Sequence, residues 1–528
     1  MKNSIILLFA FVMIFSSCSK STSNLESIPK NASSVTAINL TSLIRKLDYS
    51  SMKDLKFMRA MNKEIAEENR KASRMMEDLM ENPMSSGFDF LSDVYVYTLN
   101  EAEDENFVCV SIALKNKDKF KDFAKKLIRE TEEDYELIEE TAFEYFLMRN
   151  LAISFDDSKA VILLPINRSS RKNLDYQAEA VMELSEEKQI TNDENFSKFI
   201  KEKEDISFWI SSNAFKGERE FRQAEKEFGF DLSDNFLSSH ISFNKGQIEL
   251  SSNFSLNEDL KKEMAMDIMG KGLGGKLLNY FPKEYLAIYA FSVNTDELFE
   301  AIEDEKEYDK LADQFEKMTK NSLQEFIQNL EGNVLIDVYG MRAMEIKTRY
   351  GTRTKEMPLV GAVLDFKNKE VIYDLINQMP EDFLVDFNDY FEIELPGMSP
   401  VYLAVNENEL YVSNDYDGLL DYALADSPKN TLNDAEIASN LKNNASFASL
   451  NLDIANYPNN IKDMMYENMG REERKMMRIF ENTAEGINVY MEDNTSARMT
   501  LDLANKDENS LNTIIKFVDD NYKSIMEL

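Results

Sequence analysis

The chain has 528 residues, of which 43% are hydrophobic and 11% aromatic. A chain of this length and composition can bury sizeable hydrophobic cores in two or more domains, which excludes an intrinsically disordered protein. It carries 60 Lys and Arg against 96 Asp and Glu, a formal net charge of −36. Because this charge repels phosphate groups, it excludes nucleic acid as a partner.

Residues 1–17 have the pattern of a signal peptide. Lys2 precedes an unbroken apolar run from Ile5 to Phe15, which is shorter than the roughly 20 residues that a membrane-spanning helix needs. Small residues then stand directly before Cys18. We therefore expect cleavage before Cys18 and attachment of lipid to its thiol, although the same pattern also fits an ordinary secretory signal in which Cys18 has no special role.

The Phe-Ser-Ser-Cys sequence that ends at Cys18 resembles a bacterial lipobox, in the form common in Bacteroidetes. The resemblance implies anchoring by three acyl chains, palmitate among them, since one chain alone holds a protein only marginally. Residues 18–27 are rich in serine and poor in apolar residues, so we expect a flexible tether. No acidic cluster follows Cys18, which favours an outer-membrane protein that faces the periplasm over one on the cell surface.

Short sequences recur in the same order at a nearly constant spacing. Residues 115–117 (KNK) return at 367–369, and residues 151–153 (LAI) return as LAV at 403–405. The other matches are 28–30 with 281–283, 93–95 with 337–339, and 174–176 with 420–422. They predict two tandem copies, residues 28–269 and 281–528, joined by a glycine-rich linker at 270–280.

The apolar periodicity predicts the same order of elements in both copies. Each begins with a strand, continues with amphipathic helices and a hairpin, and ends with a second hairpin. The expected strands and hairpins are 35–40, 94–114, 152–164, 206–211 and 239–254 in the first copy, and 286–293, 334–366, 401–413, 446–452 and 487–503 in the second. We expect an α+β fold of two tandem copies, each a mixed, largely antiparallel sheet whose helices cover one face.

Three motifs partly resemble sites of known chemistry. The linker spells G-x-x-x-x-G-K at 270–276, but Leu277 replaces the metal-binding Ser or Thr of a P-loop. Asp415 and Asp417 alternate before a glycine as in a calcium loop, yet the twelfth position, counted from Ser413, is Leu424 and not a bidentate Glu. His240 is the single histidine, and strand alternation places it on a polar face with Ile241 pointing inward.

These observations predict no catalytic residues, no cofactor and no metal site. With one histidine and two cysteines, one of them Cys18, the usual zinc ligands are too few. Cys109 lies in a strand-like apolar run and is expected to be a buried thiol. Carboxylate catalysis needs only two acids about 5–10 Å apart, so a hydrolase acting on envelope glycan stays open as an alternative.

A candidate binding surface consists of Trp209, Arg349 and Arg353. Alternation puts Trp209 on the polar strand face between two serines, where an aromatic ring can stack on a sugar or anchor a partner, although cover by a helix is the commoner reason for this placement. Arg349 and Arg353 lie in a basic hairpin loop, whereas the matching loop of the first copy, near 101–105, is acidic. Three outcomes stay open: the opposite charges dock the two loops to each other, the basic loop binds an anionic ligand, or the loops remain solvated, which is the commonest case.

The lipobox, the opening stretch Pro29–Leu43 and the doubled layout resemble a Bacteroidetes lipoprotein family known as domain of unknown function 4836. The resemblance covers nearly the whole mature chain and brings no catalytic residues. We therefore expect a non-catalytic protein that is held at the membrane by its N-terminal lipid and that binds or scaffolds an envelope protein or glycan. The alternatives are the glycan hydrolase and a subunit of an outer-membrane assembly.

Overall fold

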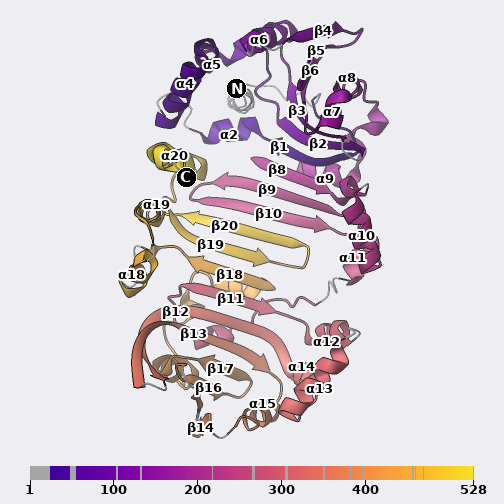
Figure 1. The fold of residues 1–528 in the computed structure, drawn as a ribbon. Helices are drawn as coiled ribbons and strands as arrows, with labels where there is room; N and C mark the ends of the chain where they lie inside the picture. Colours follow the sequence, from indigo (N-terminus) through magenta and orange to yellow (C-terminus); the bar gives the residue numbers. More distant parts are fainter. Residues whose placement is uncertain are drawn as a thin grey trace. The chain divides into compact units, whose positions relative to one another are not determined.

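The computed structural model describes residues 24–47, 55–102, 105–130, 134–216, 218–263, 268–303, 307–348, 351–380, 382–394, 398–454, 457, 459–467 and 469–526. The fold is α+β, with helices packed on antiparallel strands (Figure 1). The chain divides into two compact units. Unit 1 takes Met1–Leu260 together with Asn505–Leu528, and unit 2 takes Lys261–Ala504.

The sheet of unit 1 is antiparallel throughout its described pairings. Its strands follow one another side by side in the order β4 (Tyr135–Glu139), β5 (Glu144–Met148), β6 (Leu151–Phe155), β7 (Lys159–Pro165), β3 (Glu105–Ala113), β2 (Val94–Ala102), β1 (Ala32–Ile38), β8 (Ile206–Ser211), β9 (Phe236–Asn244) and β10 (Gln247–Ser255). The first strand of the chain, β1, therefore lies inside the sheet between β2 and β8.

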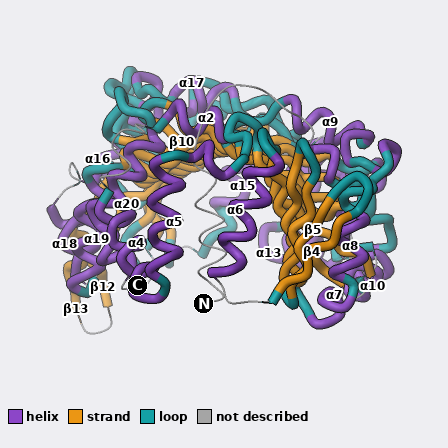
Figure 2. The backbone as a smooth tube through the Cα atoms, turned by 90° about the horizontal axis from the view of Figure 1, so that it is seen from above, coloured by secondary structure: helices purple, strands orange, loops and turns teal. Residues whose placement is uncertain are grey.

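Helices cover both faces of this sheet, not one face as the sequence led us to expect. Figure 2 shows β4 and β5 between α6 on one side and α7 and α8 on the other. The helices of unit 1 are α2 (Leu40–Lys46), α4 (Lys56–Glu68), α5 (Arg70–Glu81), α6 (Lys117–Glu130), α7 (Arg168–Lys172), α8 (Leu174–Ala180), α9 (Glu194–Lys201), α10 (Arg219–Phe228) and α20 (Ser510–Met526), and α11 (Glu258–Glu263) follows β10.

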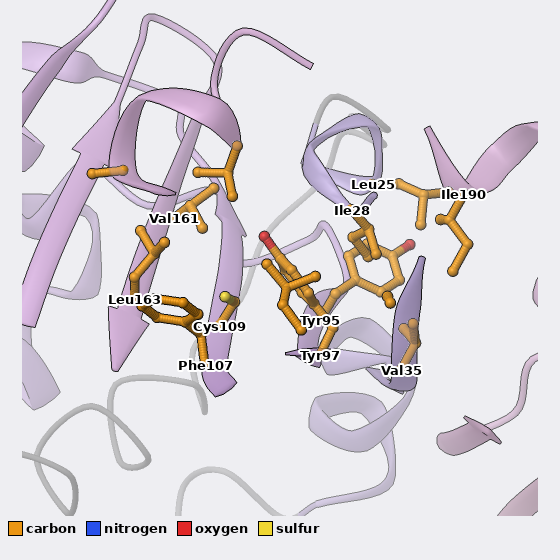
Figure 3. Packing of buried hydrophobic residues seen from close by; sticks show 14 of the residues in the cluster. Leu25, Ile28, Val35, Tyr95, Tyr97, Phe107, Cys109, Val161, Leu163 and Ile190 are labelled. Atoms are coloured by element: carbon orange, nitrogen blue, oxygen red, sulfur yellow. The ribbon is translucent and has the colours of Figure 1, made fainter. Parts of the chain in front are cut away.

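Alternation along the strands sends side chains into two separate hydrophobic clusters. One cluster contains Val35, Tyr97, Cys109 and Leu163 and is closed by Leu25, Ile28 and Ile190 from segments outside the sheet (Figure 3). The other cluster packs under α6 and is rich in phenylalanine, with Phe88, Phe120, Phe146 and Phe155. Both faces of the central strands are therefore core, which explains their high apolar content.

Unit 2 has its own antiparallel sheet. Its strands lie in the order β14 (Leu384–Asp386), β15 (Phe391–Ile393), β16 (Val401–Val405), β17 (Glu409–Ser413), β13 (Gly351–Phe366), β12 (Leu330–Thr348), β11 (Ala287–Ser292), β18 (Ser446–Asn451), β19 (Ala484–Met491) and β20 (Ser496–Leu503). Its helices are α12 (Thr295–Glu303), α13 (Tyr308–Thr319), α14 (Leu323–Asn329), α15 (Lys369–Ile376), α16 (Tyr416–Gly418), α17 (Ala438–Asn443), α18 (Asn459–Glu467) and α19 (Arg471–Glu481).

The glycine-rich segment 270–280 is part of unit 2 and does not link two units. Leu277, Leu278 and Tyr280 are buried in the main hydrophobic cluster of this unit. Gly272 has a φ of 110°, and a Cβ at this position would lie 2.4 Å from the carbonyl oxygen of Lys442. Gly272 therefore allows close packing of backbone against backbone, which is a structural role distinct from a hinge or a phosphate-binding loop.

Residues 505–528, which we expected to close the second copy, belong to unit 1. The side-chain amide of Asn509 donates to the carbonyl oxygen of Phe243 on β9 at 2.8 Å. The backbone N–H of Phe57 at the start of α4 donates to Asp519 Oδ1 on α20 at 3.0 Å. Unit 1 is therefore built from two stretches of chain that are separated by the whole of unit 2.

Candidate functional site

Trp209 does not contribute to an exposed binding surface. Only 2% of the residue is exposed, and its ring packs edge-on against Phe196 of α9 and stacks on Phe236 of β9, with centroid distances of 5.4 and 5.6 Å. The neighbouring serines Ser207 and Ser211 are buried on the same face. The expectation of a solvent-facing Trp209 is thus wrong, and the alternative of cover by a helix is correct.

His240 lies on this same covered face. Its Nδ1 is 2.9 Å from Ser207 Oγ, and its ring lies 5.3 Å from that of Phe199 on α9. Burial lowers the pKa of His240, since an imidazolium loses hydration there. Ile241, which we expected to point inward, is on the half-exposed face. We assign His240 a packing role.

Other residues singled out from the sequence are placed only in part. Cys109 is buried within the cluster of Figure 3, as expected for a structural thiol. Arg353 is exposed on β13 in unit 2, so it does not form one surface with the buried Trp209 of unit 1. Cys18, Arg349 and the acidic loop residues 103–104 lie outside the described residues.

A group of aromatic side chains that the sequence analysis did not select lies at the surface of unit 2. We call Phe387, Tyr390, Tyr402 and Tyr416 the aromatic platform. The rings of Phe387 and Tyr390 are stacked, with centroids 4.7 Å apart and planes 10° from parallel. Tyr416 lies 5.8 Å from Tyr390 and 5.3 Å from Tyr402. Phe387 and Tyr416 remain 43% and 38% exposed, which is unusual for side chains of this size that are free to pack inside.

The turn between β14 and β15 creates the stacked pair. Asn388 has a φ of 70°, a left-handed conformation that asparagine tolerates well. Its N–H donates to Asp386 Oδ1 at 2.8 Å, and the N–H of Phe387 donates to the carbonyl oxygen of Tyr390 at 2.9 Å. These bonds bring the two ends of the turn together, so that the rings of Phe387 and Tyr390 meet.

Tyr390 and Tyr402 connect the platform to the core, because both pack against the main hydrophobic cluster of unit 2. Tyr402 comes from β16, and Tyr416 opens α16 directly after β17. Three separate segments therefore supply the four rings. The arrangement is held from below by buried residues, so the exposed rings do not have to be ordered when something binds to them.

An ion pair fixes the segment that carries Tyr416. Nη1 of Arg342 on β12 lies 2.8 Å from Asp415 Oδ1 and 3.0 Å from Asp417 Oδ2, so one guanidinium joins the acids on either side of Tyr416. A Cβ on Gly418 would lie 2.7 Å from Asp415 Oδ2. Asp415 and Asp417, whose spacing resembles that of a calcium loop, thus hold an arginine. In the described part of the chain, no group of three or more His, Cys, Asp or Glu side chains is arranged to hold a metal ion.

All four platform residues lie in a strongly acidic stretch of the sequence. Residues 382–426 contain eleven Asp and Glu and no Lys or Arg. A hydrogen bond with Tyr416 raises the pKa of Tyr390 to about 12. Burial raises the pKa of Tyr402, and the nearby charges of Glu392 and Glu394 raise it further. Tyr390 and Tyr402 are therefore neutral hydroxyl groups at physiological pH, next to an excess of carboxylates.

Carboxyl groups with a raised pKa are found elsewhere in unit 2: Asp337, which is buried, and Asp365, which is half-buried. Burial raises the pKa of Asp337 well above its ordinary value, and Asp337 is 0% exposed. No side chain of the described residues donates a hydrogen bond to it. Burial also raises the pKa of Asp365, which accepts hydrogen bonds from Asn333. A substrate cannot reach Asp337, so this carboxyl is not placed for acid–base chemistry on a glycan.

The sequence contained a partial signal for the platform. Phe387 and Tyr390 stand three residues apart among acids, but Tyr402 and Tyr416 are distant in sequence and join them only in the folded chain. What the site offers is a shallow aromatic surface with tyrosine hydroxyls and nearby carboxylates. Such a surface suits stacking, cation–π contacts and hydrogen bonding.

Within the described residues, no helix has both the length and the apolar character needed to cross a bilayer. Solved structures of TP0453 share some local arrangement with the chain, but the overall likeness is weak. Its crystal form I is 8% identical over 48% of this chain and 87% of that chain with a TM-score of 0.23, and crystal form III is 9% identical over 47% and 88% with a TM-score of 0.24.

No curated protein matches the chain. The profile of one protein family, described as a domain of unknown function (DUF4836), matches residues 24–511. The match runs through both units and includes every residue of the aromatic platform. The chain therefore belongs to the DUF4836 family.

Proposed function

We propose that this protein is a lipid-anchored component of the bacterial envelope that binds a partner through the aromatic platform and catalyses no reaction. Lipid on Cys18 would hold it at the outer membrane, facing the periplasm. The observation that carries the proposal is the aromatic platform, in which the exposed rings of Phe387 and Tyr416 rest on the half-buried Tyr390 and Tyr402, since exposed aromatic rings with a fixed position are typical centres of binding surfaces.

The proposal includes two tandem copies of one ancestral unit. Two sets of strands support it: β1 pairs with β2 and β8, and β11 pairs with β12 and β18. In unit 1 the sheet continues from β2 to β3 and then through β7, β6, β5 and β4, and on the other side from β8 to the hairpin β9–β10. In unit 2 it continues from β12 to β13 and then through β17, β16, β15 and β14, and on the other side from β18 to the hairpin β19–β20. A duplicated fold leaves one copy free to acquire a surface that the other lacks, and the platform is such a surface in unit 2.

The rival function, a carboxylate-dependent hydrolase, receives less support. It requires two accessible acids that converge, one with a raised pKa. The carboxyl whose pKa is raised most clearly, that of Asp337, is fully buried. Membership of a larger outer-membrane assembly is compatible with the platform, because the partner bound there can be another envelope protein.

Capture from envelopes tests the binding proposal. Wild-type protein and a Phe387→Ala/Tyr416→Ala variant are purified in mild detergent and used to capture partners from detergent-solubilised envelopes. The matched control, Tyr176→Ala/Phe228→Ala, removes a tyrosine and a phenylalanine that are 69% and 63% exposed in unit 1. We expect at least a tenfold loss of a reproducible partner in the platform variant and no loss in the control. Equal capture by all three proteins contradicts the proposal.

Fractionation tests the anchor separately. A Cys18→Ser variant cannot carry a thioether-linked lipid, so we expect it to move from the envelope pellet to the soluble fraction. The wild-type chain serves as the reference in the same experiment. Complete retention of the variant in the envelope argues against lipid anchoring and leaves the platform proposal untouched.

A further inference from the structure

We infer that the aromatic platform binds a cationic protein segment, one whose Arg or Lys side chains lie on the exposed rings while the surrounding carboxylates neutralise them. This inference rests on the proposed binding function and specifies its ligand class. Three observations in unit 2 support it: the exposed ring faces, the local excess of acid, and Arg342, which already pairs with the two acids beside Tyr416.

The stacked pair leaves a ring face open. One face of Phe387 is covered by Tyr390 at 4.7 Å, yet Phe387 is 43% exposed, so the exposed area belongs largely to its opposite face and edge. The face of an aromatic ring carries negative electrostatic potential and attracts a guanidinium or ammonium group. The chain uses this contact itself in unit 2, where Arg498 lies 4.4 Å above the ring of Tyr490.

The surrounding charge selects against anionic ligands. Residues 382–426 contain eleven acids and no base, and Lys276 and Arg342 from outside this stretch pair with Glu409, Asp415 and Asp417. Acids therefore remain in excess, and phosphate-bearing glycans and acidic proteins meet repulsion at this surface. Asp386 and Asp389 are exposed in the turn that carries Phe387, and Glu394 is exposed at the end of β15. These carboxylates attract the charges of a basic segment, whereas a neutral ligand has no such electrostatic attraction.

Arg342 gives a direct precedent at the same place. Its guanidinium bridges Asp415 and Asp417, the residues on either side of Tyr416. Asp417 keeps 68% of its side chain exposed while it does so, and therefore retains capacity for a second cationic group. The platform is thus an aromatic surface whose border already accepts one arginine of the protein itself.

A neutral glycan is the other kind of ligand that stacks on aromatic rings, and its lack of charge distinguishes it from a cationic segment. The probe is a fluorescein-labelled nonapeptide of alternating Arg and Gly. A second peptide replaces each Arg with citrulline, which has the same shape without the charge, and cellohexaose represents a neutral glycan. Binding to the full lipidated protein in mild detergent is measured by fluorescence anisotropy at about 150 mM salt, where charges far from the site are largely screened.

We expect the Arg peptide to bind wild-type protein at least about tenfold more tightly than it binds Phe387→Ala/Tyr416→Ala, as the loss of two cation–π contacts implies. The Tyr176→Ala/Phe228→Ala control, which has the same net charge, should bind within twofold of wild type. The citrulline peptide should bind wild type at least tenfold more weakly than the Arg peptide does. Unchanged affinity in the platform variant overturns the inference, because the acidic chain then holds the peptide through its overall charge.

A charge-matched pair of variants tests the role of the nearby acids. Asp389→Asn/Asp417→Asn and Glu186→Gln/Glu187→Gln each remove two negative charges from exposed positions, the second pair in unit 1. We expect the first to weaken the Arg peptide about threefold or more and the second to leave it unchanged. Equal effects, or platform-dependent binding of cellohexaose without preference for the Arg peptide, contradict the inference. If envelope capture still depends on the platform, the proposed function survives that result and only the ligand class fails.

Discussion

The two units place different side chains at corresponding positions of their sheets. In unit 1, the residues paired in register across β7, β3, β2, β1 and β8 are Leu163, Cys109, Tyr97, Val35 and Trp209. In unit 2, those across β17, β13, β12, β11 and β18 are Ser413, Gly361, Asp337, Ile288 and Ser449. The first row is apolar and mostly bulky, whereas the second, apart from Ile288, consists of small or polar residues. The same order of strand pairing can therefore hold different side chains in the interior, because the backbone hydrogen bonds do not depend on which side chains the strands carry.

The difference extends to the buried aspartates. In unit 1, Asp205 is fully buried and accepts hydrogen bonds from Lys46, Ser42 and the backbone N–H of Phe243. In unit 2, Asp337 is equally buried, and no described side chain donates to it. Unit 1 keeps its buried charge paired, whereas unit 2 keeps a carboxyl whose raised pKa leaves it protonated over a wider pH range.

Removing the largest member of the apolar row should have the largest effect. Trp209→Ala deletes a side chain that contacts Phe196 and Phe236, and we expect the free energy of unfolding to fall by about 3–5 kcal/mol. Urea denaturation gives the magnitude, and hydrogen exchange should show the loss in peptides of β8 and β9. Phe228→Ala, at an exposed site of the same unit, should change stability by less than about 0.5 kcal/mol. A similar small change for Trp209→Ala would show that the row does not hold unit 1 together.

Breaking the pairing of Asp205 should come next. Lys46→Met leaves a buried carboxylate without its cation, and we expect a loss of about 3 kcal/mol, at the low end for such pairs because Lys46 keeps 25% of its side chain exposed. Lys56→Met, which breaks the exposed pair with Asp520, should leave the unfolding midpoint unchanged. If both variants unfold at the same denaturant concentration, the contrast between the two aspartates has no energetic basis.

Filling the smallest position of the polar row should destabilise unit 2. A Cβ on Gly361 would lie 2.4 Å from Cε1 of Phe281, whereas unit 1 carries Cys109 at the corresponding register position. We expect Gly361→Ala to lower the free energy of unfolding by about 1–3 kcal/mol, since the ring of Phe281 must move. Thermal unfolding of the variant measures this, and an unchanged midpoint would mean that the core near Phe281 is loosely packed.

The buried carboxyl of Asp337 should make unit 2 less stable as pH rises. Its folded-state pKa is above the unfolded value of about 3.9. The folded state therefore binds more protons in the window above pH 4, and stability falls through that window as pH increases. Asp337→Asn should raise the free energy of unfolding by about 1 kcal/mol at pH 8 and give no gain at pH 4. An equal effect at both pH values would exclude ionisation as the cause.

His240 should give unit 1 the smallest pH effect on stability, with a sign opposite to that of Asp337. Burial lowers its pKa below the unfolded value of about 6.5, so its contribution to stability is complete above that pH and is lost as pH falls through the folded-state pKa. At acidic pH, amide hydrogen exchange in β9 should speed up less in His240→Gln than in wild type. The corresponding difference in the free energy of opening should be at most about 1 kcal/mol. An acid response identical to wild type would assign the sensitivity of unit 1 to other groups.

Periodicity in the sequence predicted much of the fold. The strand expected at 206–211 is β8 with the same bounds, and the hairpin expected at 94–114 is β2 and β3. The direction of Trp209 could not be predicted in this way. Its strand alternates Phe208 and Ile210 with Trp209 and serines, so both faces are partly apolar, and only the position of α9 decides which face is buried.

Alignment of short matches was less reliable than periodicity. The match of residues 93–95 with 337–339 places Asp93 against Asp337, but pairing with β1 and β11 sets Tyr97 at the register position of Asp337. The two alignments differ because strand register depends on burial and pairing, not on local identity. By the same pairing, Ser449 occupies the position of Trp209.

The placement of residues 505–528 in unit 1 has a consequence for biogenesis. During synthesis, the sheet of unit 1 is made first, yet α20 follows the entire unit 2. The contacts of Asn509 with Phe243 and of Asp519 with Phe57 can form only after the last segment has been made. Unit 1 thus remains incomplete until synthesis ends, and we expect late truncations to harm the unit that was made first.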